Sequence, residues 1–459
     1  MIDPHIFRAY DIRGKALTQL TEESCELIGK AFGSIVREKY ALDHPKIVIG
    51  RDMRASGPLF EEAMIRGAVS TGCQVLEIGE TPSPLNYFTI CRLKLDGGLQ
   101  ITASHNPSED NGVKLQIRDA VAFAGEDIQT LRKRIEAGNF LTGTGSRESV
   151  DAVTPFLNWV KKQFGGSGKG LTVAIDCGNG MTGPVAMKAF RETGCSITGL
   201  YTDPDGNFPN HLADPSKQAT LKDLQDLVKK QHADIGFAFD GDGDRVGLID
   251  ENGEIRSADE VLLFLAQDYL QRFPGKPVIF TVAMSSTLET EIRKWGGEPI
   301  MCPVGHSYVE HEMRKHGAPL GGEQSGHFFL EDIAFGYDDA LTVALQILAI
   351  LKREGKPLSE VLGSYPKVFI AHERRPHCED GKKAAVIASV IEHFQKTYPT
   401  NTMDGARIDF GEGAWANIRQ SNTAPKISIC VEARSEAKLK AVEAEILEHM
   451  KKYPEVGSE

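Results

Sequence analysis

The sequence predicts an α/β protein with three related mixed α/β domains, followed by a separate α+β domain at the C-terminal end. Three stretches share one pattern, in which an apolar β-branched run leads through a small or polar turn into a helical pattern. They are PKIVIGRDMRAS from Pro45, LTVAIDCGNGMTG from Leu171 and KPVIFTVAMSSTLETEIRKW from Lys276. After about Tyr365 this pattern gives way to strands and helices typical of an antiparallel α+β domain.

Length and composition are those of a globular protein rather than of a disordered or membrane protein. A chain of 459 residues implies two to four domains, and 41% hydrophobic with 25% charged residues is ordinary for such proteins. The longest apolar stretch, ALTVALQILAIL at 340–351, is too short to span a membrane and is expected to form a buried helix. The net charge of −12 argues against nucleic acid as a main partner.

The first residues and the cysteines indicate a cytoplasmic protein. The segment MIDPHIFRAYDIRG carries charge early and has no apolar run, so it does not resemble a secretory signal. Eight cysteines are scattered from Cys25 to Cys430 without a CxxC pair, which favours reduced thiols over a disulfide framework or a zinc site. Any metal is therefore expected to be held by oxygen.

Each of the three repeated stretches is followed by a second strand-like run that ends in a glycine-containing polar loop. These loops are TASHNP (102–107), DGDGDR (240–245) and GGEQSGH (321–327). Ligands of open α/β sheets bind beyond the carboxyl ends of the strands, so one ligand could contact all three loops. Three ordinary turns are the alternative.

The loop DGDGDR is expected to bind a metal ion. Glycines between Asp240, Asp242 and Asp244 allow a tightly curved backbone to turn three carboxylates toward one point. Three carboxylates repel one another strongly unless a hard cation such as Mg²⁺ neutralises them. A solvated acidic turn is the alternative.

Ser104 in TASHNP is interpreted as a phosphate carrier, although a serine in a polar turn is more often a turn former. Phosphoryl transfer requires positively charged side chains, and Arg13, Lys114 and Arg245 lie in or shortly after the polar motifs. The chain has neither a GxSxG elbow nor a P-loop, so acyl transfer and nucleotide binding are not indicated. A phosphorylated Ser104 would supply a further ligand to the metal.

Three segments of the chain suggest recognition of a phosphorylated sugar. In GGEQSGH, Glu323 and Ser325 can bind vicinal hydroxyls, although a glycine-rich turn with a structural His327 is the alternative. His306 in VGHSYV is either a polar contact or a structural histidine. In RQSNTAP (419–425), the arginine, serine, asparagine and threonine could surround a phosphate.

Five motifs in this order, FRAYDIRG, TASHNP, DGDGDR, GEQSGH and RQSNTAP, resemble the α-D-phosphohexomutase superfamily over essentially the whole chain, and its bacterial phosphomannomutase/phosphoglucomutase branch in particular. The resemblance implies four domains around a central cleft, at residues 1–149, 150–252, 253–365 and 366–459. GEQSGH also occurs in phosphoglucosamine mutases, so mannose, glucose and glucosamine all remain candidate sugars.

The resemblance also implies roles for individual residues. Ser104 would carry the phosphoryl group and, with Asp240, Asp242 and Asp244, hold one Mg²⁺ per chain, while His105, Lys114 and Arg245 would take part in catalysis. The residues implied to bind substrate are Tyr10, Arg13, His306, Glu323, Ser325, His327, Arg419, Ser421, Asn422 and Thr423. One departure is Ala283, at a position where relatives often place a lysine.

The reaction implied is an intramolecular phosphotransfer between O1 and O6 of a hexose, through phosphoserine and a bisphosphorylated sugar. Phosphosugars would be the small-molecule partners, a hexose 1,6-bisphosphate the activator, and the enzyme a monomer or weak homodimer without nucleic-acid or membrane partners. A Mg²⁺-dependent sugar phosphatase and a non-catalytic sugar-phosphate sensor are the alternatives from other classes.

Overall fold

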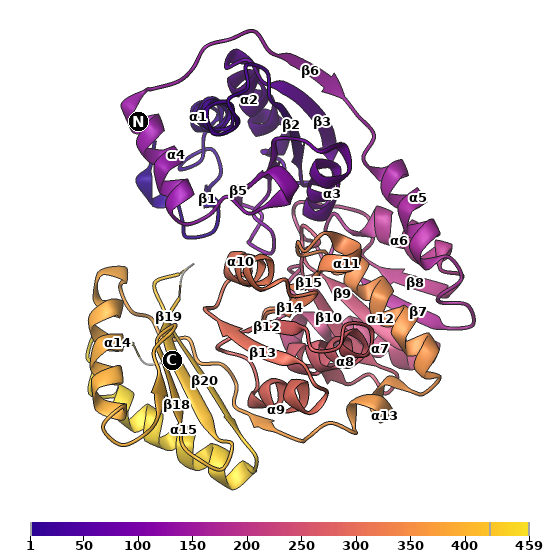
Figure 1. Ribbon diagram of the computed structural model, residues 1–459, viewed down its shortest axis with the longest axis vertical. Helices are drawn as coiled ribbons and strands as arrows, with labels where there is room; N and C mark the ends of the chain where they lie inside the picture. The colour runs from indigo at the N-terminus through magenta and orange to yellow at the C-terminus, as the bar shows by residue number, and fades with distance from the viewer. Residues whose placement is uncertain (1, 422–423, 458–459) are drawn as a thin grey trace. The chain divides into compact units, whose positions relative to one another are not determined.

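The computed structural model describes residues 2–421 and 424–457, and its chain divides into two compact units. The first unit consists of Met1–Val261 and Ser325–Glu360, and the second of Leu262–Gln324 and Val361–Glu459 (Figure 1). Among the described residues, no helix has the length and apolar character that crossing a membrane requires. All eight cysteines are free.

The first sheet lies in the first unit and has six strands in the order β1-β5-β4-β2-β3-β6. Its central strand β2 pairs in parallel with β3 and β4, whereas β5 and β1 run antiparallel to their neighbours. The strands are β1 (Ile12–Lys15), β2 (Lys46–Arg51), β3 (Gln74–Glu80), β4 (Gly97–Ile101), β5 (Asp110–Ile117) and β6 (Ser146–Ser149). The helices of this part are α1 (Glu22–Tyr40), α2 (Gly57–Ser70), α3 (Ser83–Leu93) and α4 (Glu126–Ala137), with 3-10 turns at Pro4–Ile6 and Arg118–Ala120.

Helix α1 shows how the sequence pattern builds this core. Thr21 caps its N-terminus by accepting a hydrogen bond from the Ser24 backbone, and Ala41 ends it in the left-handed conformation. Between these ends, apolar side chains at helical spacing, among them Ile28, Phe32 and Val36, are fully buried in the same cluster as the β2 residues.

The second sheet, also in the first unit, has the order β11-β10-β9-β7-β8. Its central strand β7 pairs in parallel with β8 and β9, and β10 and β11 are antiparallel. The strands are β7 (Thr172–Asp176), β8 (Ser196–Leu200), β9 (Ile235–Phe239), β10 (Val246–Asp250) and β11 (Ile255–Arg256). The helices here are α5 (Val153–Phe164), α6 (Gly183–Glu192) and α7 (Lys222–Gln231), with a 3-10 turn at Gln218–Leu221.

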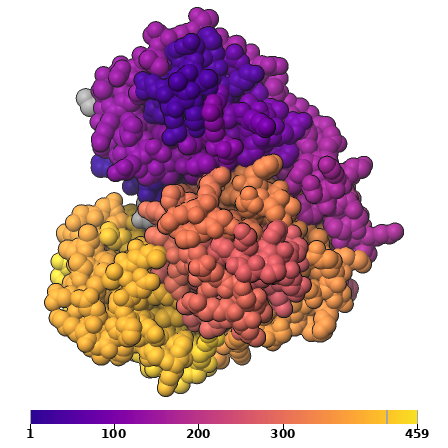
Figure 2. All heavy atoms as spheres, in the orientation of Figure 1, coloured from indigo at the N-terminus to yellow at the C-terminus, as the bar shows by residue number. Residues whose placement is uncertain are grey.

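The chain returns to the first unit through β15 (Phe328–Leu330), α11 (Glu331–Ala334) and α12 (Ala340–Glu354). Helix α12 packs against α5 and the strands β9 and β10, and Figure 2 shows orange atoms of the returning stretch against the magenta atoms of the earlier one. Its residues from Ala340 to Leu348 are buried, which confirms the buried helix predicted from ALTVALQILAIL.

The second unit repeats the same strand arrangement. Its strand β12 (Pro277–Thr281) pairs in parallel with β13 (Glu298–Cys302) and β14 (Leu320–Gly322). The helices around them are α8 (Ala258–Arg272), which crosses from the first unit, α9 (Ser286–Lys294) and α10 (His306–His316). Thus β2, β7 and β12 each pair with the next strand on one side and the next but one on the other, which confirms the prediction of three related mixed α/β domains.

The last sheet is antiparallel, as predicted, with the order β16-β20-β19-β18-β17. The elements are β16 (Phe369–Ile370), α14 (Asp380–Phe394), β17 (Thr400–Asn401), β18 (Ala406–Asp409), β19 (Trp415–Gln420), β20 (Ile427–Ala433) and α15 (Glu436–Met450), preceded by α13 (Leu358–Leu362). The first strand of this sheet is short, because only Phe369 and Ile370 form a ladder with β20.

Two histidines stack where α14 and α15 pack together. The rings of His393 and His449 lie 4.0 Å apart, and His449 Nε2 lies 2.9 Å from the hydroxyl of Tyr453. Burial, followed by the nearby charges of His393 and Lys452, lowers the pKa of His449 to about 4. The unfolded chain therefore binds a proton that the folded chain does not between about pH 6.5 and pH 4.

We expect the stability of this C-terminal domain to fall as the pH is lowered through that window, by at most about 1.4 kcal/mol per pH unit from this one group. Thermal unfolding of the wild type and of His449→Phe, measured at pH 7.5 and pH 5, tests this. The variant keeps a ring beside Phe394 but cannot titrate, so its melting temperature should fall less than that of the wild type between pH 7.5 and pH 5. Equal losses in the two proteins would show that His449 does not contribute.

Candidate active site

Ser104 lies just beyond the carboxyl end of β4, in a backbone conformation that few residues adopt. Its φ angle is +52°, in the left-handed region, and its side chain is buried. The backbone N–H of Ser104 donates to Thr102 Oγ1 at 2.9 Å. Arg13 donates to the Ala103 carbonyl at 3.3 Å and to Asn106 Oδ1 at 3.1 Å, so its side chain also holds the serine loop in place.

The hydroxyl of Ser104 contacts the first aspartate of DGDGDR. Ser104 Oγ donates to Asp240 Oδ2 at 2.6 Å, and His105 Nδ1 lies 3.0 Å from Ser104 Oγ. Two loops separated by more than a hundred residues in the sequence therefore meet at one hydroxyl group, each at the carboxyl end of a parallel strand.

The aspartate loop is folded around Asp240. Its Oδ1 accepts hydrogen bonds from the backbone N–H groups of Gly243, Asp244 and Arg245 at 2.9, 3.1 and 3.2 Å. Gly241 is required for the approach to the serine loop, because a Cβ atom there would lie 2.4 Å from the Ser104 carbonyl oxygen. Ser83 fixes the next aspartate by donating to Asp242 Oδ2 at 2.5 Å.

The three aspartates form a buried cluster whose oxygens suit a divalent cation. One carboxylate oxygen of each of Asp240, Asp242 and Asp244 lies within 4.8 Å of the others. The Oδ1 atoms of Asp242 and Asp244 are buried and accept no hydrogen bond. Buried acceptors without a donor are costly, so these atoms fit the oxygen ligands of a hard metal ion.

Charge within the cluster is only partly balanced by protein groups. Lys114 on β5 contacts Asp242 Oδ2 at 2.6 Å and also contacts Asp244. Burial opposes the ionised form of Asp244, but Lys114, His327 and Arg245 outweigh it and hold the pKa of Asp244 well below its usual range. Burial, and then the charges of Asp244 and Asp242, raises the pKa of Asp240 well above its usual range.

A cation resolves this imbalance. Two like charges about 4 Å apart repel by about 4 kcal/mol at the effective dielectric constant typical of such sites. The raised pKa of Asp240 shows that its ionised form is disfavoured beside the other two carboxylates; a divalent cation held by the three carboxylates would favour the ionised form beside Ser104.

His105 is poised as a neutral base. Burial, and then the positive charges of Arg245 and Arg13, lowers the pKa of His105 well below its usual range. A neutral imidazole 3.0 Å from the serine oxygen can accept the hydroxyl proton.

Arg245 is oriented by a histidine that the sequence analysis assigned to the substrate. Arg245 Nε donates to His327 Nε2 at 2.9 Å, and His327 Nδ1 lies 2.8 Å from Asp338 Oδ2. His327 is only 2% exposed. It is therefore placed to support Arg245, and Asp338, which the sequence analysis did not single out, supports His327 in turn.

The remaining candidates are distributed over both units. Tyr10 and Ser325 belong to the first unit, partly exposed, whereas His306, the first residue of α10, and the buried Glu323 belong to the second. Ala283 is the second residue after the end of β12 and is buried.

The predicted phosphate loop lies in the second unit after β19. The Arg419 guanidinium donates to the Gln420 carbonyl at 3.0 Å, and its Nε is buried without a hydrogen-bond acceptor. Ser421 Oγ receives a hydrogen bond from Arg375 at 3.1 Å, and Lys383 donates to the Ser421 carbonyl at 2.7 Å. Asn422 and Thr423 lie outside the described residues. Arg375 and Lys383 are thus two further cations near this loop, absent from the sequence-based set.

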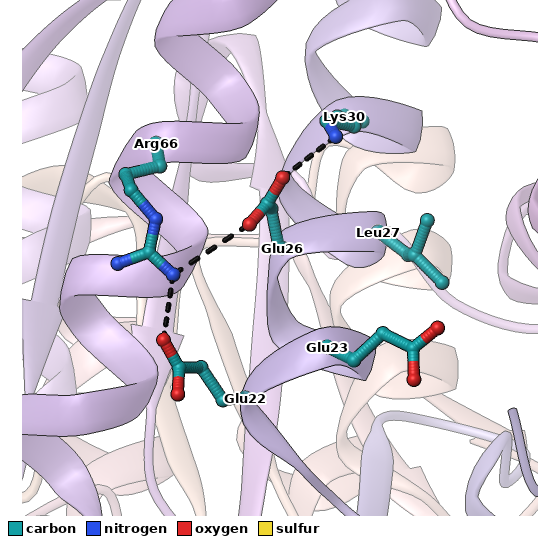
Figure 3. A pocket seen from close by; sticks show the side chains of 6 residues that line it. All are labelled: Glu22, Glu23, Glu26, Leu27, Lys30 and Arg66. Atoms are coloured by element: carbon teal, nitrogen blue, oxygen red, sulfur yellow. Dashed lines mark hydrogen bonds and ion pairs between the residues drawn. The ribbon is translucent and has the colours of Figure 1, made fainter.

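A surface hollow of about 420 Å³ on α1 and α2 carries no comparable chemistry (Figure 3). Its lining charges pair with one another: Arg66 contacts Glu22 at 2.7 Å and Glu26 at 3.5 Å, and Lys30 contacts Glu26 at 2.6 Å. Its cations are thus already occupied by its carboxylates.

A buried serine against a carboxylate cluster, on repeated α/β domains, defines a phosphoryl-transfer enzyme by its chemistry. Four family models match the chain consecutively. They are "Phosphoglucomutase/phosphomannomutase, alpha/beta/alpha domain I" at residues 4–142, domain II of the same family at 148–253, domain III at 257–369 and the C-terminal domain at 375–449. The chain belongs to the phosphoglucomutase/phosphomannomutase family.

Relatives match over nearly the whole length. A "Phosphomannomutase/phosphoglucomutase" of Pseudomonas aeruginosa is 38% identical, over 95% of this chain and 93% of its own, and a "Phosphoglucomutase" of Neisseria gonorrhoeae is 36% identical, over 95% of each chain. A crystal structure of a "Phosphoglucomutase/phosphomannomutase family protein" from Burkholderia thailandensis superposes with a TM-score of 0.91, at 35% identity and 98% coverage of both chains.

We expect Gly241→Ala to separate the serine and aspartate loops, because the added methyl group has no room beside the Ser104 carbonyl. Turnover should fall by at least about a hundredfold, since misplacing reacting groups by an ångström costs about that much. Kinetic assays beside thermal melting check this, with Gly381→Ala, where an added Cβ atom meets nothing within 4 Å and the φ angle is not positive, as a control for a glycine substitution elsewhere. A Gly241→Ala enzyme with ordinary turnover would contradict the loop contact.

Proposed function

We propose that the chain interconverts hexose 1-phosphate and hexose 6-phosphate, acting on mannose and glucose, with Ser104 as the carrier of the phosphoryl group. The observation that carries this proposal is the 2.6 Å hydrogen bond from the buried Ser104 hydroxyl to Asp240, the first of three clustered carboxylates. The match to four consecutive family models supports the reaction type.

The cluster of Asp240, Asp242 and Asp244 fits one Mg²⁺, which when bound would supply positive charge to stabilise the transferring phosphoryl oxygens. In the first transfer the phosphorylated Ser104 gives its phosphoryl group to a sugar hydroxyl, whose proton passes to a basic group of the site, while the released serine oxygen takes a proton from His105 at 3.0 Å. In the return step Ser104 Oγ attacks the other phosphate of the bisphosphorylated sugar and its proton returns to His105. The released sugar oxygen takes back the proton held by the basic group.

Cations around the cluster balance the charge that spreads over the phosphoryl oxygens during transfer. Burial opposes the charged form of Lys114, but Asp242 and Asp244 outweigh it and keep the pKa of Lys114 well above its usual range, so it stays protonated. Arg245 stays in place through its bond to His327. Both are proposed to act on the phosphoryl group at Ser104.

The sugar and its second phosphate are assigned to the remaining loops. Glu323 and Ser325 are proposed to bind the O3 and O4 hydroxyls, with Tyr10 and His306 as further contacts. Arg419, Ser421, Asn422 and Thr423 are proposed to hold the phosphate that is not being transferred. Because the bisphosphorylated sugar must reverse its orientation between the two transfers, this phosphate-binding loop has to accept the phosphate at either end of the molecule.

A hexose 1,6-bisphosphate is proposed as the activator, because it restores phosphoserine whenever the intermediate escapes. We place the reaction in the cytoplasm, where eight free cysteines remain reduced. The enzyme is proposed to act as a monomer or weak homodimer, since all the groups assigned come from a single chain.

Glucosamine phosphate is the less favoured sugar. The relatives cited above carry the names phosphomannomutase and phosphoglucomutase, although the GEQSGH loop is compatible with glucosamine. An ammonium at C2 would also lie among the arginine and lysine side chains assigned to the phosphates.

We expect Ser104→Ala to lower turnover by at least about a thousandfold while largely preserving substrate binding, because no other group can store the phosphoryl. Turnover with saturating bisphosphate and Mg²⁺, together with calorimetric binding of glucose 1-phosphate, measures the two effects separately. Retention of more than about a tenth of wild-type turnover would refute the assignment of Ser104.

Mannose 1-phosphate and glucose 1-phosphate should both be converted, with kcat/KM values within about a hundredfold of each other, because they differ only at the C2 hydroxyl. A coupled assay of the two sugars and glucosamine 1-phosphate, side by side, gives the comparison. Faster conversion of glucosamine 1-phosphate than of both neutral sugars would assign the enzyme to the phosphoglucosamine mutases. Release of free phosphate without isomerisation would identify a phosphatase.

A further inference from the structure

One arginine, Arg54, is wholly buried against the loop that carries Ser104. Its guanidinium donates to Asp52 Oδ2 at 3.1 Å, and its side chain is not exposed at all. Its other hydrogen bonds go to three carbonyl oxygens of the serine loop, those of Ser104 at 2.9 Å, Asn106 at 2.6 Å and Pro107 at 2.5 Å, and to the carbonyl of Asp110 at the start of β5 at 2.9 Å. An arginine has five N–H donors, so every donor of this side chain has an acceptor.

A second path from the same ion pair reaches the other side of Ser104. Asp52 Oδ2 also accepts a hydrogen bond from Thr102 Oγ1 at 2.7 Å, and Thr102 Oγ1 accepts one from the Ser104 N–H at 2.9 Å. Arg54 thus holds the Ser104 carbonyl directly, while Asp52 holds its N–H through Thr102.

Ser104 needs such restraint, because its φ of +52° is unfavourable for a residue with a side chain. The left-handed conformation costs about 1–2 kcal/mol, and it persists only where the surroundings impose it. In this conformation the hydroxyl faces Asp240 at 2.6 Å.

We propose that Arg54 and Asp52, together with Thr102, are positioning residues that hold Ser104 where its hydroxyl can exchange a phosphoryl group at the aspartate cluster. The inference rests on the proposed role of Ser104 as phosphate carrier and adds the groups that determine its orientation. A single transferring atom must keep its place through two transfers in opposite directions, so the rate of each depends on this restraint.

The sharpest test compares Thr102→Val with Thr102→Ser. Valine has the shape of threonine but removes the hydroxyl that links Asp52 to the Ser104 N–H, whereas serine keeps it. The readouts are the single-turnover rate at which glucose 1,6-bisphosphate phosphorylates Ser104, followed by intact mass, and the Kd of glucose 1-phosphate. We expect the rate to fall at least about tenfold in Thr102→Val with Kd within about twofold of wild type, and Thr102→Ser to stay within about threefold in both.

A second comparison addresses the guanidinium itself. Lysine keeps the charge of Arg54 but has only three donors in a different geometry, so Arg54→Lys should slow Ser104 phosphorylation by about a hundredfold. Arg51→Lys is the matched control, because Arg51 ends β2 just before Arg54 and pairs with Glu61 at 2.8 Å and Glu80 at 2.6 Å. This variant should stay within about threefold of wild type. If circular dichroism shows that Arg54→Lys does not fold, the Thr102 pair decides.

A folded Thr102→Val enzyme that phosphorylates Ser104 at the wild-type rate overturns the inference. So does a Thr102→Val enzyme in which Kd weakens as much as the rate falls, because that result indicates general damage to the site. These outcomes are distinguishable from failure of the proposed function, which Ser104→Ala tests. An inactive Ser104→Ala with an unimpaired Thr102→Val leaves the phosphate carrier in place and removes only the positioning role.

Discussion

The close approach of two loops, one ending in Ser104 and the other beginning with Asp240, is the constraint on which the rest of the site depends. The hydroxyl and the carboxylate are 2.6 Å apart, and a single methyl group at Gly241 would prevent it. Each loop follows a parallel strand, and each is held by its own hydrogen bonds: the aspartate loop by three backbone N–H groups on Asp240 Oδ1, the serine loop by Arg54. The parallel strands therefore place the two loops, and the loops carry the hydroxyl and the carboxylates.

Charge explains why this contact is built so rigidly. The three aspartates, the buried Lys114 and the buried ion pair between Arg54 and Asp52 are gathered around the loop of Ser104. Burying any of these charged groups without its partners would be costly. Lys114 reaches two aspartates and leaves two of their oxygens without a donor. The same imbalance that would destabilise the empty cluster makes it receptive to a divalent cation and, through it, to a phosphoryl group.

The repeated sheets and the family were predictable from the sequence, because strand–turn–helix patterns and ordered motifs are local features. The starts at Pro45, Leu171 and Lys276 each led to an interior strand of a sheet, paired on both sides. Arg54 and Asp338 were not predictable, because the sequence does not distinguish a single buried arginine or aspartate from an exposed one. Only the fold brings Arg54 to the carbonyl groups around Ser104, fifty residues further along the chain. The one indication in the sequence was that RDMR follows a strand-like run, as TASHNP does, so that both segments are expected at the same edge of a sheet. For His327 the loop predicted a sugar contact, which stays a prediction, and the structure adds contacts with Arg245 and Asp338 that the sequence could not indicate.

The central claim is that Ser104 carries the phosphoryl group at a carboxylate-bound cation, and mapping a radiolabel tests it most directly. Dephosphorylated enzyme would be mixed with glucose 1,6-bisphosphate labelled in both phosphates, with and without Mg²⁺, and digested to locate the label. The account expects one phosphoryl group per chain, on the peptide containing Ser104, formed only with the divalent cation and discharged on adding unlabelled glucose 1-phosphate. Label on another residue, or equal labelling of Ser104 in the absence of any divalent cation, would contradict it.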